Sequence, residues 1–89
     1  MLGGVTVGKK EKLIKRLLAL PKDFTFEEAE TLLVALGFVK SNKGKTSGSR
    51  VRFRKDNIII DLHKPHPRKE LLSYQVKDMI QHLKEADLI

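Results

Sequence analysis

The chain has no cysteine among its 89 residues, and this absence removes several kinds of chemistry. Without thiols there is no disulfide framework and no thiolate nucleophile. A zinc site would depend on the three histidines together with carboxylates, and His63 and His66 show no spacing that is typical of zinc ligands. We therefore expect the protein to work without a metal or other cofactor.

Long apolar runs are absent as well, and no stretch approaches the roughly 18 residues that a membrane-spanning helix needs. Residues 1–8 are glycine-rich and have neither a charged start nor a long apolar core, so we expect a flexible terminus and no secretion signal. The expected location is the cytoplasm, without membrane contact. The remaining residues 9–89 fit a single domain and exclude large enzyme folds such as barrels.

Acidic residues are scarce in the middle of the chain. Residues 40–69 hold ten Lys and Arg against two Asp, a net charge of +8, whereas residues 1–39 carry +1 and residues 70–89 carry −2. A block of this kind is typical of a surface that binds a polyanion such as nucleic acid. The simpler interpretation is a solvated sheet face that is rich in lysine and arginine.

Two helices are predicted in the first half of the chain. The first covers residues 9–20 and is stopped by Pro21. The second begins at a capping box, with Thr25 as N-cap and Glu28 three positions later, and ends before Gly37. The apolar stripe of the first helix consists of Leu13, Ile14, Leu17 and Leu18. The buried face of the second consists of Phe26, Ala29, Leu32, Leu33 and Leu36.

Strands are predicted after Gly37, over residues 38–40, 50–55 and 58–63, with a tight turn at residues 56–57. The second strand alternates strictly, so one face is apolar and the other is basic. The side chains expected on the basic face are Arg50, Arg52 and Arg54. The third strand should place Ile59, Asp61 and His63 on one face and Ile58, Ile60 and Leu62 on the other.

A last helix is predicted from about Ser73, as N-cap, to Leu88, with an inner stripe of Val76, Met79, Ile80 and Leu83. The order of elements is then two helices, three strands and a helix. This order predicts an α+β fold, in which a three-stranded antiparallel sheet has the helices packed on one face. The arginines would occupy the opposite face.

The segment that follows the third strand combines imidazoles, cations and prolines, in the order Lys64-Pro65-His66-Pro67-Arg68-Lys69. Neighbouring cations favour neutral imidazole, which can act as a general base. The alternative is an ordinary surface loop. Residues 43–49 contain glycines and lysines but precede a strand, so they do not indicate a nucleotide cofactor. Few aromatic residues are present, which favours recognition of RNA through phosphates and 2′-hydroxyls over base stacking.

Three stretches of the sequence resemble the HicA (YcfA-like) family. They are Gly37-Phe38-Val39, residues 45–53 with the order Lys-Thr-Ser-Gly-Ser-Arg-Val-Arg-Phe, and residues 63–71 with the order His-Lys-Pro-His-Pro-Arg-Lys-Glu-Leu. The resemblance covers about residues 25–89, so the first helix would be an addition to the family core. It implies a fold related to the double-stranded-RNA-binding domain. It also implies a metal-independent mRNA endonuclease toxin of a type II toxin–antitoxin system, blocked by a HicB antitoxin.

The resemblance has one departure that matters for the chemistry. The family motif is Gly-Ser-His, with the histidine catalytic, whereas this chain has Gly48, Ser49 and Arg50. Arginine stays protonated near neutrality, so Arg50 can bind phosphate but cannot act as a general base.

Three functions therefore remain open: an mRNA endonuclease that uses other histidines, a non-catalytic RNA-binding module, and a protein that mainly complexes an acidic HicB-like antitoxin. For catalysis we predict His66 first and His63 second, with His82 as an ordinary surface residue. The residues predicted to bind RNA are Lys45, Ser49, Arg50, Arg52, Arg54, Lys64, Arg68 and Lys69.

Overall fold

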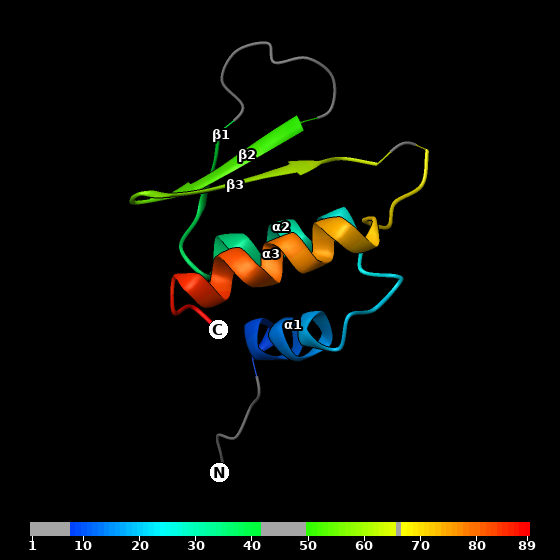
Figure 1. Cartoon of the computed structure of the whole chain (residues 1–89), viewed down its shortest axis with the longest axis horizontal. Coiled ribbons are helices and arrows are strands. Elements are labelled where there is room, and N and C mark those ends of the chain that lie inside the picture. The colour runs from blue at the N-terminus through cyan, green and yellow to red at the C-terminus, as the bar shows by residue number, and fades with distance from the viewer. Residues whose placement is uncertain (1–7, 42–49, 66) are drawn as a thin grey trace.

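The computed structural model describes residues 8–41, 50–65 and 67–89. The elements follow in the order α1 (Lys9–Leu18), α2 (Phe26–Ala35), β1 (Val39–Ser41), β2 (Arg50–Lys55), β3 (Ile58–His63) and α3 (Ser73–Glu85). They form three layers, in which α2 and α3 lie between the sheet and α1 (Figure 1). The α+β prediction is confirmed: a three-stranded antiparallel sheet carries all its helices on one side.

The outermost helix, α1, buries a narrower stripe than its sequence predicts. Leu13 and Leu17 are buried and Ile14 is half-buried, but Leu18 keeps 43% of its surface exposed. The physical reason is that α1 is covered from one side only, by α2 and α3. The helix also ends earlier than predicted, at Leu18, and Leu20 takes a left-handed backbone conformation with φ of 55°.

The predicted capping box at the start of α2 is confirmed, and it is tied to α1. The Thr25 hydroxyl accepts from the Glu28 backbone N–H at 3.1 Å, and a Glu28 carboxylate oxygen accepts from the Thr25 N–H at 2.9 Å. Arg16 of α1 donates to both oxygens of Glu28, at 3.0 and 3.1 Å. Partial burial raises the pKa of Glu28, but the hydrogen bonds from Arg16 and Thr25 outweigh it and lower the pKa. This network holds α1 against the N-terminus of α2.

The register of the sheet follows from the two-residue turn between β2 and β3. Lys55 pairs with Ile58, and Asp56 in the turn takes a φ of 53°, a conformation that Asp tolerates. The pairing continues without a bulge to Arg50 opposite His63. The alternation predicted for both strands is confirmed, since the buried side chains are Val51, Phe53, Ile60 and Leu62.

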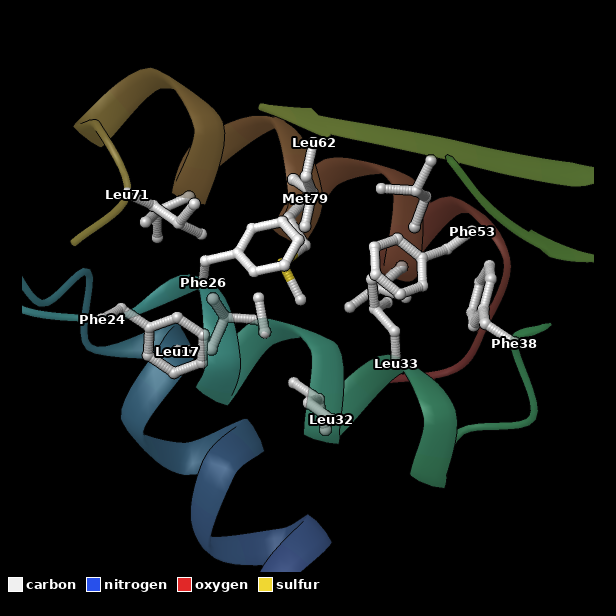
Figure 2. Packing of buried hydrophobic residues seen from close by; sticks show 14 of the residues in the cluster. Leu17, Phe24, Phe26, Leu32, Leu33, Phe38, Phe53, Leu62, Leu71 and Met79 are labelled. Carbon is white, nitrogen blue, oxygen red and sulfur yellow. The ribbon is translucent and has the colours of Figure 1, made fainter. Parts of the chain in front are cut away.

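The core lies between the sheet and the pair α2 and α3. Figure 2 shows Phe26, Phe53 and Met79 in this space, and the rings of Phe26 and Phe53 are 6.4 Å apart between centroids. Phe24 is also fully buried, although it precedes α2 and belongs to no helix or strand. The Arg16 guanidinium lies 5.6 Å from the centroid of the Phe24 ring.

The last helix, α3, begins one residue earlier than the predicted cap implies. Its N-cap is Leu72, and Ser73 is already helical, so the prediction of Ser73 as N-cap is wrong. The reason is that Gln75 supplies the cap, because its side-chain oxygen accepts from the Leu72 backbone N–H at 3.2 Å. The helix ends at Glu85, before the predicted Leu88, and Asp87 has a φ of 60°.

Candidate nucleic-acid interface

The face of the sheet that points away from the helices carries the arginines of β2, as predicted. Because residues of a strand alternate between faces, Arg50, Arg52 and Arg54 are exposed while Val51 and Phe53 are buried. Paired residues on neighbouring strands share the same face. We call this surface the outer sheet face, and it consists of Val39, Ser41, Arg50, Arg52, Arg54, Ile59, Asp61 and His63.

Asp61 is the acidic residue of the outer sheet face, and Arg52 holds it. The Arg52 guanidinium donates to the two Asp61 oxygens at 2.9 and 3.2 Å, and Arg50 lies 4.0 Å away. The hydrogen bonds from Arg52 lower the pKa of the Asp61 carboxyl, helped by the charges of Arg50 and His63 and opposed by partial burial. In contrast, Arg54 has Val39 and Ile59 as its cross-strand neighbours. The face therefore keeps a basic excess, which is centred on Arg50 and Arg54.

His63 lies directly opposite Arg50 at the end of the hairpin. The two residues are cross-strand partners, and both are exposed. Such pairs have Cβ atoms about 5 Å apart, so an imidazole and a guanidinium share one small area. The His63 backbone is held from the helix side of the sheet. There the buried Gln75 side chain of α3 donates to the His63 carbonyl at 3.2 Å.

A second group of cations follows β3, beside the first turn of α2. Two backbone hydrogen bonds hold this segment, from Phe26 N–H to the Lys69 carbonyl at 3.0 Å and from Leu71 N–H to the Phe24 carbonyl at 2.8 Å. A pocket of about 220 Å³ results, and its cationic lining is Lys64, Arg68 and Lys69. The Lys64 ammonium lies 6.0 Å from the centroid of the Phe26 ring. The remaining lining residues are Thr25, Phe26, Glu27, Pro65 and Pro67.

The predicted RNA-binding residues thus form two groups, the arginines of the outer sheet face and the cations beside α2. Lys45, Ser49 and His66 lie outside the described residues, as does the glycine-rich stretch 43–49. His82 is on α3, where its Nδ1 lies 2.9 Å from the Asp78 carbonyl, and it takes no part in either group.

Within residues 8–41, 50–65 and 67–89, no three His, Asp or Glu side chains gather as they would around a metal ion. No helix in this part of the chain has the length and apolar character to cross a membrane.

Two residues of this region were missed by sequence reasoning. Tyr74 keeps 61% of its surface exposed in the first turn of α3, close to His63 and Arg68. Gln75, at the next position, is the buried polar residue that links α3 to β3. The sequence signal for Gln75 was its place three residues after the N-cap, which becomes recognisable only when Leu72 is known to be the cap.

Comparison with known proteins identifies the family. The sequence model for the HicA toxin of bacterial toxin–antitoxin systems matches residues 26–88, which contain α2, the whole sheet and α3, while α1 precedes the matched segment. No curated protein and no solved structure matches the chain. The family implies an antitoxin partner. Because the match covers most of the chain and includes both groups of cations, this protein belongs to the HicA toxin family of bacterial toxin–antitoxin systems.

Proposed function

We propose that this protein is the RNA-directed toxin of a type II toxin–antitoxin system and that it cleaves mRNA in the cytoplasm without a metal ion. The observation that carries the proposal is the pairing of His63 with Arg50 on a basic sheet face. A histidine can exchange a proton near neutral pH, and an arginine beside it can bind the phosphate that reacts.

The reaction that this pair supports is attack by the 2′-hydroxyl of RNA on the adjacent phosphorus. The general base removes the 2′-hydroxyl proton, a pentacoordinate phosphorane develops negative charge, and the 5′-oxygen leaves with a proton. The products are a 2′,3′-cyclic phosphate and a 5′-hydroxyl. We assign the base to His63 and charge stabilisation to Arg50, and we assign the proton that leaves with the 5′-oxygen to His66, the other histidine predicted from the sequence.

The position of His63 supplies a replacement for the histidine that the family motif contains and this chain lacks. Arg50 stands where the family has its histidine, and it cannot remove a proton. His63 supplies an imidazole on the neighbouring strand, directly across from that position. The same substitution favours a second candidate function, a toxin that binds and occludes transcripts without cutting them. The two candidates differ in whether the parent protein cleaves RNA in the presence of EDTA.

RNA binding should weaken steeply with salt. Five of the described cations are expected to contact phosphates, and they are Arg50, Arg54, Lys64, Arg68 and Lys69. Arg50 lies 4.0 Å from Asp61 and Arg68 lies 3.9 Å from Glu70, and a phosphate can replace such long, exposed ion pairs. If these cations neutralise about five phosphates, the logarithm of the affinity for duplex RNA should fall against the logarithm of salt with a slope of roughly −4 to −5. A filter-binding titration measures this slope.

Matched single variants test which surface of the protein binds the RNA phosphates. Arg54→Ala should make the slope shallower by about 1, because one phosphate contact is lost. Lys12→Ala is the control, since Lys12 is exposed on α1, the helix farthest from the sheet. A slope near zero for the parent, or equal effects of the two variants, would contradict the proposed interface.

The antitoxin partner is proposed to be a HicB-like acidic protein that covers the outer sheet face. A basic surface attracts an acidic partner, and a toxin must be held inactive in its own cell. We expect the purified toxin–antitoxin complex to have lost salt-dependent RNA binding, because RNA and antitoxin compete for Arg50 and Arg54. Co-expression, purification and the same filter assay test this. A complex that binds RNA as tightly as the toxin alone would show that the partner docks elsewhere.

A further inference from the structure

A hollow of about 310 Å³ lies between the end of β3 and the first turn of α3. It is continuous with the outer sheet face because His63 belongs to both. It also adjoins the pocket beside α2, because Pro65 and Arg68 line the two. The residues that line the hollow are His63, Pro65, Arg68, Leu72, Tyr74 and Gln75.

The lining of the hollow combines large apolar side chains with one arginine. Tyr74 and Leu72 keep 61% and 43% of their surfaces exposed, which is unusual for large apolar side chains placed side by side. The cation of the lining is Arg68, whose guanidinium lies 3.9 Å from a Glu70 carboxylate oxygen, and Lys64 lines the adjoining pocket. An exposed aromatic ring among cations is the combination that binds unpaired nucleotides, by stacking on the base and pairing with the phosphate.

The floor of the hollow is held by two hydrogen bonds of a buried side chain. Gln75 is 5% exposed, and both ends of its amide are engaged. Its nitrogen donates to the His63 carbonyl at 3.2 Å, and its oxygen accepts from the Leu72 N–H at 3.2 Å. This link fixes the first turn of α3, and therefore Tyr74, relative to the end of β3. A preformed site of this kind loses little entropy when it binds a flat ring.

We propose that this hollow binds one unpaired base of the RNA, stacked on the ring of Tyr74, while the flanking phosphates contact Arg50 and Arg68. The inference rests on the proposed RNA-binding function and adds a selectivity to it. RNA that can present an unpaired base beside His63 is bound more tightly than a continuous duplex. The base is thereby placed next to the Arg50–His63 pair, where the backbone would be cut.

The test compares two short RNA duplexes that differ only in one unpaired 2-aminopurine nucleotide. Tyr74→Ala should weaken binding of the bulged RNA by about 5- to 100-fold, the range found for loss of one stacked base. Tyr74→Phe keeps the ring and should bind within about twofold of the parent. Quenching of 2-aminopurine fluorescence should appear with the parent and Tyr74→Phe and vanish with Tyr74→Ala. Binding of the fully paired duplex should be the same for all three proteins.

Each other outcome overturns the inference in a recognisable way. If the parent shows no salt-dependent RNA binding at all, the proposed function fails and the base site with it. If the parent binds RNA but Tyr74→Ala affects both duplexes equally, or neither, RNA binding stands and the base site is wrong. If Tyr74→Ala weakens only the complex with the acidic antitoxin, the hollow is a protein-docking surface. An unchanged thermal unfolding midpoint for Tyr74→Ala confirms that the exposed side chain was removed without loss of the fold.

Discussion

Replacing His63 by alanine should lower the rate of metal-independent RNA cleavage by about two to four orders of magnitude, the usual contribution of a positioned general base. The reason is that the reaction needs a group that can take the 2′-hydroxyl proton near pH 7. Arg50 and Arg52, its neighbours on the outer sheet face, cannot do so. Affinity for RNA should change little, since these cations remain in place.

The measurement is cleavage of a labelled mRNA fragment in the presence of EDTA, with His82→Ala as the matched control. His82 lies on α3, outside both groups of cations, so its loss should leave the rate unchanged. His66→Ala tests the other histidine predicted from the sequence. If His63→Ala cuts RNA as fast as the parent, His63 has no catalytic role. If the parent does not cut RNA but binds it, the protein is the binding module.

Replacing Phe53 by alanine should lower the free energy of unfolding by about 3–5 kcal/mol. Phe53 is fully buried in the middle strand, and its ring centroid is 6.4 Å from that of Phe26. Alanine would leave a cavity that the rigid sheet cannot close, and small domains have only about 5–15 kcal/mol of stability in total. The variant should unfold at temperatures where the parent is still folded. RNA binding should be lost with the sheet, because Arg52 and Arg54 flank Phe53 on β2.

Urea denaturation followed by circular dichroism measures the change, and Val39→Ala serves as the control. Val39 is on the edge strand with 68% of its surface exposed, so its truncation should change stability by no more than about 0.5 kcal/mol. Similar losses for the two variants would mean that Phe53 is not in the core that Figure 2 shows.

The parts of the fold that sequence predicts well are those with a local physical signal. Alternation in β2 and β3 assigns the buried and exposed faces correctly, because every second residue of a strand points the same way. The capping box at Thr25 fixes the start of α2, because its hydrogen bonds involve residues only three apart.

Features that depend on tertiary packing were not predictable in this way. Phe24 is in the core although it has no periodic neighbours, because the segment 68–71 pairs with the chain just before α2. Leu18 is exposed because α1 forms the outer layer, and no pattern within the helix reveals that only one side is covered.

The candidate site was predictable in part. The arginines of the basic face follow from alternation, and the pairing of Arg50 with His63 was already implied by the two-residue turn, since pairing proceeds stepwise from Lys55 and Ile58. The hollow at Tyr74 was not predictable from the sequence, because it forms only when α3 lies against the end of β3. That placement comes from the burial of Val76, Met79 and Leu83 in the core. Gln75 adds a contact with the His63 carbonyl that spans twelve positions in the sequence.

The ends of the RNA fragments produced in EDTA test the central claim most directly. With His63 as base and Arg50 beside the reacting phosphate, the parent should release fragments with a 2′,3′-cyclic phosphate and a 5′-hydroxyl, and a single 2′-deoxynucleotide at the cut site should abolish cleavage there. Fragments that carry a 5′-phosphate, or cleavage that continues at the 2′-deoxynucleotide, would contradict the account, because neither can arise from attack by the 2′-hydroxyl.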